Sequence, residues 1–150
     1  MTINPYPYLS QWSNSSDPSS SCVLTCLAMI LSVKPDQLWL DCRLRAWDRL
    51  APETVDRLSI LYKRPYKLKK DLTFDHLISG TILYGSWTAG GHCVLVTANS
   101  EDTLIYHDPL GIFDGKKYDY SLVGENQNVS RENSSKYIGY SGDIWGHLPV

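Results

Sequence analysis

The chain has 150 residues, of which 43% are hydrophobic, and its formal net charge is −2. This length predicts a single domain, residues 1–150, with enough apolar surface to bury a substantial core. The weak negative charge argues against a nucleic-acid-binding protein, because such proteins usually present a strongly basic patch.

The N-terminal segment, Met1-Thr2-Ile3-Asn4-Pro5, has neither a basic region nor a long apolar one and does not resemble a signal peptide. We therefore expect synthesis in the cytoplasm, with any export following another route. The first nineteen or so residues contain three early aromatics, Tyr6, Tyr8 and Trp12, around Pro5 and Pro7. This composition predicts an extended arm rather than a core element.

The longest apolar run begins at Cys22 and predicts a helix over residues 21–32, with a preceding serine as its N-cap. Apolar residues occupy nearly every side of this helix, which indicates a central buried position. The run is too short to cross a bilayer. Because proline disfavours helical backbone in the residue before it, we expect the helix to end at Lys34-Pro35.

Further helical segments follow. Asp36 can cap a helix over residues 36–47, and Pro52-Glu53 suits the start of a third helix. That third helix would carry Val55, Leu58 and Leu61 on one face. Residues 73–78 predict a short helix that stops at Gly80. The basic cluster of Lys63, Arg64, Lys67, Lys69 and Lys70 is interpreted as a solvated loop.

The second half of the chain has β character. Residues 81–84, 93–97 and 103–106 are short β-prone runs separated by turn residues, and residues 99–102 suit a hairpin between the last two. Residues 136–140 and 144–148 could add strands, whereas the polar stretch 121–135 predicts a loop. Helices first and an antiparallel sheet second indicate the α+β class.

Cys22 is the candidate nucleophile. A polar loop of small residues precedes it, so the cysteine should lie at a surface and at the first turn of the buried helix, where backbone N–H groups favour a thiolate. Most free cysteines are small buried hydrophobes, an interpretation that suits Cys26, Cys42 and Cys93 better. We expect all four cysteines to be thiols, because a chain of this size and compartment does not need a disulfide framework.

Two histidines compete for the role of general base. His107 is next to Asp108 in sequence, but consecutive residues of a strand face opposite ways, so the two are poor partners. If strands 93–97 and 103–106 form a hairpin, His92 and Asp108 lie side by side across its open end. That pairing would orient an imidazole with a carboxylate. His92 follows Gly90-Gly91, whose small size lets other backbone or a substrate approach closely. The sequence thus favours a cysteine hydrolase with His92 as base and Asp108 as its partner.

The chain resembles the C39-like cysteine peptidases, which have a papain-like fold. The resemblance rests on five segments. They are Tyr8-Leu9-Ser10-Gln11 with Cys22-Val23-Leu24-Thr25-Cys26, Gly91-His92-Cys93-Val94-Leu95-Val96 with His107-Asp108-Pro109-Leu110-Gly111, and the closing Asp143-Ile144-Trp145-Gly146-His147. It implies Cys22 as nucleophile, His92 as base, Asp108 as orienting acid and Gln11 as oxyanion donor. No cofactor is implied.

The resemblance says less about the substrate. Val23-Leu24 replaces the Gly-Pro common in transporter-linked members, which disfavours processing of bacteriocin leaders. A stand-alone domain of this size resembles phage lysis enzymes that reach the cell wall through a partner's holin-type pore. We therefore expect cleavage of peptide or amide bonds in the peptidoglycan stem peptide. A cytoplasmic peptidase with a protein substrate is the second expectation.

Two different classes stay open on the sequence alone. The same fold could serve as an inactive module that binds peptides. Alternatively, Cys22, Cys26, His92 and Asp108 could bind zinc, although the four-residue spacing of the two cysteines is unlike the usual short-loop knuckle.

Overall fold

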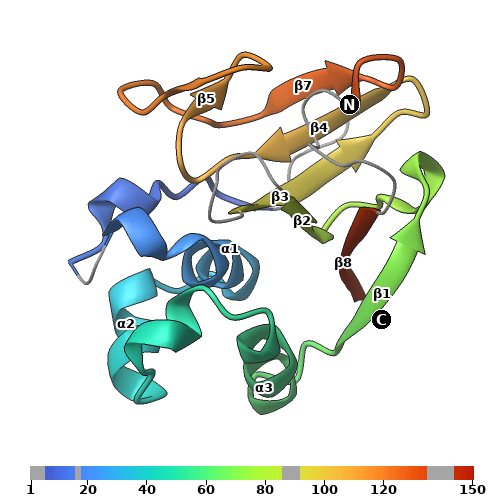
Figure 1. Cartoon of the computed structure of the whole chain (residues 1–150). Helices are drawn as coiled ribbons and strands as arrows, with labels where there is room; N and C mark the ends of the chain where they lie inside the picture. The colour runs from blue at the N-terminus through green and yellow to red at the C-terminus, as the bar shows by residue number, and fades with distance from the viewer. Residues whose placement is uncertain (1–5, 16–17, 86–91, 135–143) are drawn as a thin grey trace.

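The computed structural model describes residues 6–15, 18–85, 92–134 and 144–150. Within these ranges three helices pack on one side of a six-stranded antiparallel sheet, as the α+β prediction required (Figure 1). The helices are α1 (Cys22–Leu31), α2 (Pro35–Asp41) and α3 (Glu53–Leu61). The predicted strands at 136–140, and Gly90-Gly91, lie outside the described residues.

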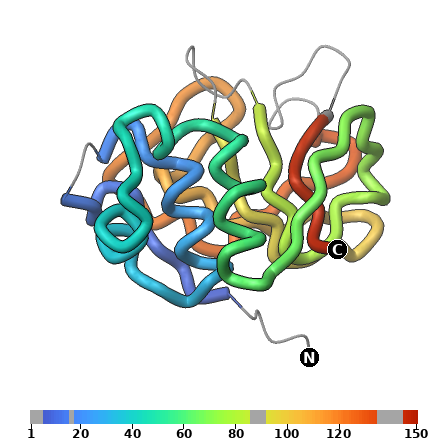
Figure 2. Tube along the Cα trace, turned by 90° about the horizontal axis from the view of Figure 1, so that it is seen from below, coloured from blue at the N-terminus to red at the C-terminus, as the bar shows by residue number. Residues whose placement is uncertain are grey.

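The sheet has the strand order β1-β8-β2-β3-β4-β7. Its strands are β1 (Tyr66–Leu72), β2 (Ile82–Gly85), β3 (His92–Asn99), β4 (Thr103–His107), β7 (Gln127–Ser130) and β8 (Ile144–Pro149). A separate two-stranded hairpin joins β5 (Ile112–Phe113) to β6 (Tyr118–Asp119). Figure 2 shows β1 running alongside β8, and β1 forms one edge of the sheet.

The central helix behaves as its apolar pattern predicts. Every residue of α1 from Cys22 to Ile30 is buried. The helix ends at Leu31, where Ser32 adopts a left-handed conformation with φ 57° and returns its N–H to the Ala28 carbonyl. Pro35 therefore begins α2 at a first-turn position rather than ending α1.

Sheet alternation divides the core into two clusters. Cys93 and Leu95 face α1 and join the cluster between helices and sheet. Val94 and Val96 face the opposite side, where they pack with Leu104 and other apolar residues. Strand β3 is thus buried on both faces, which fixes its register and the direction in which His92 emerges.

Several predicted segments differ from the structure. Helix α2 ends at Asp41 instead of continuing to residue 47, and Leu61 of α3 is exposed. The basic cluster is not a loop, because Lys67, Lys69 and Lys70 belong to the edge strand β1. Charged residues suit such an edge, since they discourage pairing with another chain.

The polar stretch 121–135 also differs from its prediction, because residues 127–130 form strand β7 on the other edge of the sheet. Val129 is the apolar residue that anchors this strand in the core. In the part of the chain that the structure describes, no single helix is long and apolar enough to span a membrane, and α1 with α2 would meet that test only as a pair bent by 98°.

Candidate active site

Cys22 is the first residue of α1 and is 7% exposed. The preceding Ser21 occupies the N-cap position, but its hydroxyl donates to the Pro18 carbonyl at 3.1 Å instead of capping the helix. Asn14 holds this arrangement by donating to the Ser21 and Thr25 hydroxyls at 2.7 and 3.0 Å. The Ser21 side chain therefore does not cap α1. The Cys22 sulfur belongs to the first turn of this helix, where the partial positive charge of the helix N-terminus favours a thiolate.

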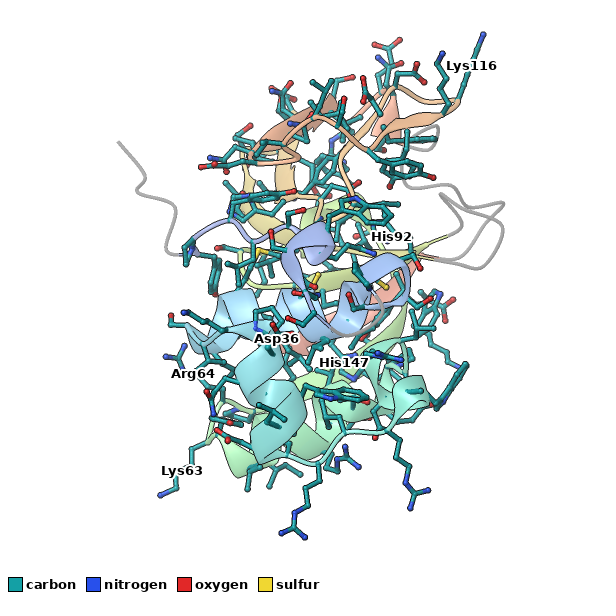
Figure 3. All side chains as sticks on the ribbon, turned by 90° about the vertical axis from the view of Figure 1, so that its left-hand side faces the viewer. Asp36, Lys63, Arg64, His92, Lys116 and His147 are labelled. Carbon is teal, nitrogen blue, oxygen red and sulfur yellow. The ribbon has the colours of Figure 1, made fainter. Side chains whose placement is uncertain are left out.

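His92 and Asp108 meet across the open end of the β3–β4 hairpin, as predicted. His92 begins β3, Asp108 directly follows β4, and the His92 Nε2 lies 2.7 Å from the Asp108 Oδ1. The strands pair with a register shift between Val96 and Ala98, so the hairpin contains a bulge. Both side chains are almost fully buried. Figure 3 shows His92 beside the N-terminal part of the chain.

Three donors fix the Asp108 carboxylate. Its Oδ1 accepts the bond from His92 and a second bond from the Leu110 N–H at 3.0 Å. Its Oδ2 accepts the Tyr118 hydroxyl at 2.7 Å. A buried carboxylate with this many donors keeps its orientation, so it also fixes the plane and tautomer of His92.

The backbone of Asp108 is held just as closely. Its N–H donates to the Gly124 carbonyl at 2.8 Å, and its own carbonyl accepts the Tyr8 hydroxyl at 2.8 Å. A Cβ on Gly124 would lie 2.1 Å from the Asp108 carbonyl oxygen, so only glycine fits at that position. The arm and the loop after β6 together position the carboxylate.

The electrostatics of the site favour an ion pair between Cys22 and His92. A hydrogen bond from the Cys93 thiol, followed by the hydrogen bond and charge of His92, lowers the pKa of Cys22 well below its ordinary value, against the effect of burial. Burial opposes protonation of His92, but the charge and hydrogen bond of Asp108 prevail and raise its pKa to about 10. The same imidazole bonds to Asp108 through Nε2 and interacts with Cys22, so it links the carboxylate to the thiol.

His107, the rival base, has a structural position. It is fully buried, its Nε2 donates to the Tyr6 carbonyl at 2.9 Å, and its Nδ1 accepts the Asn126 N–H at 3.1 Å. Both ring nitrogens are thus committed to backbone, and burial lowers the pKa of His107. It fastens the N-terminal arm to the loop before β7.

Gln11 lies where the arm passes the start of α1. Its side chain is buried, and its Nε2 donates to the Pro18 carbonyl, which also accepts the Ser21 hydroxyl. An amide nitrogen has two N–H groups, so the Gln11 Nε2 can donate one more hydrogen bond besides the one to Pro18. The Gln11 Oε1 is buried with no hydrogen-bond partner among the described residues.

The remaining cysteines are free thiols, as predicted. Cys26 and Cys93 are fully buried behind Cys22, while Cys42 lies apart, 3.8 Å from the Tyr62 hydroxyl. Among the residues that the structure describes, no three histidine, cysteine or acidic side chains are arranged to hold a metal ion.

Sequence reasoning missed Tyr118. This residue comes from β6, donates to Asp108 and packs edge-on against the His92 ring with centroids 5.7 Å apart. The hairpin β5–β6 carries it back over the site, and its sequence has no motif that would have identified the role. Gly124 was missed for the same reason, because its importance is a close backbone approach between distant segments.

No family model matches the chain, and no curated protein matches it. A similar solved structure is the crystal structure of a double glycine motif protease from an AMS/PCAT transporter in complex with the leader peptide. The TM-score is 0.63 at 15% identity, over 98% of this chain and 94% of that chain. At this identity the likeness shows the fold alone. The helices and antiparallel sheet thus have the papain-like C39 protease fold that the sequence predicted.

Proposed function

We propose that this protein is a cysteine peptidase that uses Cys22 as nucleophile and His92 as general acid and base. The observation that carries the proposal is the buried His92–Asp108 pair, 2.7 Å apart, which lies beside Cys22 at the N-terminus of α1. Three separate segments, the start of α1, the start of β3 and the end of β4, converge to make this arrangement. The fold of the double glycine motif protease supports the same conclusion.

The reaction begins with transfer of the Cys22 proton to His92, which gives a thiolate and an imidazolium. The thiolate attacks the carbonyl carbon of the substrate, and the carbonyl oxygen becomes an oxyanion. His92 then protonates the leaving amine, and the C–N bond breaks to leave an acyl-enzyme. Water, deprotonated by His92, attacks the acyl group and releases Cys22. Throughout these steps Asp108 balances the positive charge on the imidazole.

Gln11 and the backbone N–H of Cys22 are the proposed oxyanion donors. The first N–H groups of a helix have no partner within the helix, so the Cys22 N–H can point at the substrate oxygen. The second N–H of the Gln11 amide would join it. Donors placed in advance at a buried position stabilise developing charge because they need no rearrangement during the reaction.

Aromatic rings lead from the site to the surface and suit a peptide substrate. Tyr118 touches His92 and stacks on Tyr120, with centroids 5.8 Å apart. Tyr120 in turn meets Trp12 edge-to-face at 5.4 Å, and both are substantially exposed. We propose that side chains of the substrate next to the scissile bond pack on this aromatic row, the rings of Trp12, Tyr118 and Tyr120.

Within the peptidase class, the peptidoglycan stem peptide is the proposed substrate. The support is the resemblance of the sequence to stand-alone phage and bacterial members of the C39-like peptidases. The protein would then reach the cell wall through a partner's holin-type pore. The alternative is a peptide or protein substrate inside the cell. That alternative is favoured by the double glycine motif protease, whose structure holds a leader peptide.

The test compares the wild-type protein with Cys22→Ser and with Cys26→Ser, a matched thiol on the same helix. Each is incubated with peptidoglycan and with a synthetic peptide containing a Gly-Gly site, and the products are identified by mass spectrometry. We expect Cys22→Ser to release no fragments and Cys26→Ser to behave as wild type. Full hydrolysis by the Cys22→Ser protein would refute the proposal. The products that the wild-type protein releases identify the substrate and the bond that is cut.

A catalytically inactive peptide-binding module is distinguished by thiol chemistry. An enzyme of this design should have one cysteine, Cys22, that reacts rapidly with iodoacetamide at neutral pH, because interactions with Cys93 and His92 lower the pKa of its thiol. The reaction should slow in His92→Ala. Equal, slow labelling of all four cysteines would favour the binding module.

A further inference from the structure

The basic cluster of the sequence has no role in the proposed hydrolysis. Five of the 14 lysine and arginine residues fall within residues 63–70, a segment without aspartate or glutamate in a chain whose net charge is −2. All five are exposed, and they are Lys63, Arg64, Lys67, Lys69 and Lys70. None of them forms an ion pair with another described residue. A concentrated positive charge therefore faces solvent on a protein that is acidic elsewhere.

The fold sets these charges out along one edge of the sheet. Strand β1 is the outermost strand on this side, and its neighbour is β8. Lys67 and Lys69 point to the same face of the strand, about 7 Å apart, because side chains alternate along it. Lys69 lies opposite Gly146, which has no side chain that could cover it. Lys63 and Arg64 precede the strand, in the segment after α3, and Figure 3 shows both at the outside of the molecule.

Structural roles explain part of this charge. A lysine on an edge strand discourages pairing with another chain, and a cation just after α3 suits the negative end of that helix. One or two charges would serve each role, whereas the segment carries five and no acidic residue. Strand β1 alone has seven residues, a length of about 20 Å. The cations thus have the extent and the sign to contact an extended anion.

We propose that the basic edge, residues 63–70, binds a linear polymer that carries phosphate groups along its length. Positive charges spaced along a strand can meet successive phosphates of such a chain, whereas a single small anion would contact only one or two of them. The inference goes beyond the proposed peptidase function and does not depend on it, because β8 and β2 separate β1 from the strand that carries His92. A phosphate polymer close to the substrate would hold the enzyme there.

The side chains of the basic edge favour a phosphate polymer without bases over a nucleic acid. Proteins that bind single-stranded nucleic acids stack the bases on aromatic rings. Within residues 63–70 the one aromatic residue is Tyr66, which is half-buried and donates its hydroxyl to the Gly80 carbonyl at 2.7 Å. Binding at this edge would therefore rest on the phosphates alone.

The experiment titrates the full-length protein into fluorescently labelled long-chain inorganic polyphosphate and follows fluorescence polarisation at several salt concentrations. If about four or five phosphates are contacted, a plot of log K against log salt should have a slope of about −3, because each contact releases counterions. The triple variant Lys67→Gln, Lys69→Gln, Lys70→Gln should bind about tenfold or more weakly at about 50 mM salt, and its slope should be smaller by about 2.

The matched control is the triple variant Lys34→Gln, Lys116→Gln, Lys117→Gln. It removes three exposed lysines that lie outside the basic edge and changes the net charge by the same amount. We expect it to bind polyphosphate like the wild-type protein. Equal losses in the two triple variants would overturn the proposal, because net charge alone would then explain the binding. No binding of polyphosphate by the wild-type protein at low salt would overturn it as well.

Two further probes test the chemistry of the ligand. They are single-stranded DNA of mixed sequence and vesicles of phosphatidylglycerol, an anionic lipid. We expect both to bind more weakly than polyphosphate at the same concentration of phosphate groups. Tighter binding of the DNA would replace the proposal with a nucleic-acid site, and tighter binding of the vesicles would replace it with a membrane-binding surface.

A measurement on the wild-type protein decides the matter even if a variant fails to fold. Polyphosphate should slow the acetylation of Lys67, Lys69 and Lys70 by an N-hydroxysuccinimide ester, mapped by mass spectrometry, and leave Lys116 unchanged. Uniform protection of all lysines would contradict the proposal. Cys22→Ser should bind polyphosphate like the wild-type protein. Failure of hydrolysis therefore leaves this inference standing, and failure of polyphosphate binding leaves the peptidase proposal intact.

Discussion

Replacement of Asp108 separates the charge of this residue from its hydrogen bonds. The carboxylate accepts from the His92 ring, the Leu110 N–H and the Tyr118 hydroxyl. In Asp108→Asn the amide oxygen can keep the first two bonds, and the Tyr118 hydroxyl can rotate to accept from the new NH₂ group. We therefore expect this variant to retain its fold, with a free energy of unfolding within about 1 kcal/mol of wild type.

Asp108→Ala removes every acceptor at once. It leaves three donors without their acceptor, each at about 1 kcal/mol or more, and leaves the protonated His92 with only the Cys22 thiolate as counter-charge. The expected loss is about 3–5 kcal/mol, the range for breaking a buried ion pair. Urea unfolding followed by tryptophan fluorescence measures both variants, with Asp114→Asn as an exposed-aspartate control.

The charge effect is read from the pH dependence of iodoacetamide labelling at Cys22. The charge of Asp108 raises the pKa of His92, and the imidazolium in turn lowers the pKa of Cys22. In Asp108→Asn the labelling curve should therefore shift toward the ordinary thiol pKa of about 8.5. An unshifted curve, or an Asp108→Ala protein as stable as wild type, would refute this account of the pair.

Three further predictions test other parts of the site. Gln11→Ala should lower kcat by about 10²–10³ with little loss of stability, since Ser21 still satisfies the Pro18 carbonyl; an unchanged kcat would exclude an oxyanion role. Tyr120→Ala should raise KM and leave kcat unchanged, because the exposed ring belongs to the proposed binding surface and not to the reacting groups; an unchanged KM on every substrate cut would remove it from that surface. Burial lowers the pKa of His107 in the folded protein, whereas the same histidine in the unfolded chain has the ordinary pKa of about 6.5. Below this pH the unfolded chain therefore binds more protons than the folded protein at this position. As the pH falls further, His107 should reduce the free energy of unfolding by at most about 1.4 kcal/mol per pH unit. Urea titrations of wild type and His107→Gln between about pH 7.5 and 5 check this, and an identical slope in both proteins would contradict it.

The sequence predicted the elements whose pattern is local. The all-round apolar run from Cys22 identifies a buried helix, and the β-prone runs near His92 and Asp108 identify a hairpin. Strand alternation then excluded His107 as the partner of its neighbour, because adjacent residues face apart. The α+β class and the papain-like fold also follow from these patterns together with the resemblance.

Edge strands were harder to predict because their side chains are mostly solvated. Strand β1 reads as a charged loop, and β7 is a polar segment with one core residue, Val129. Such strands are stabilised by backbone pairing with a neighbour, and that pairing leaves little trace in a single sequence.

The sequence by itself placed Cys22 at the start of a buried helix, and His92 and Asp108 at matching ends of a hairpin. Only the tertiary structure decided how they are held. Tyr118 reaches Asp108 from β6, Tyr8 bonds the Asp108 carbonyl from a hundred residues away, and Cys93 meets Cys26 across the core. The physical reason is that a helix or hairpin is specified by neighbours along the chain. Contacts between distant segments depend instead on the packing of the whole domain.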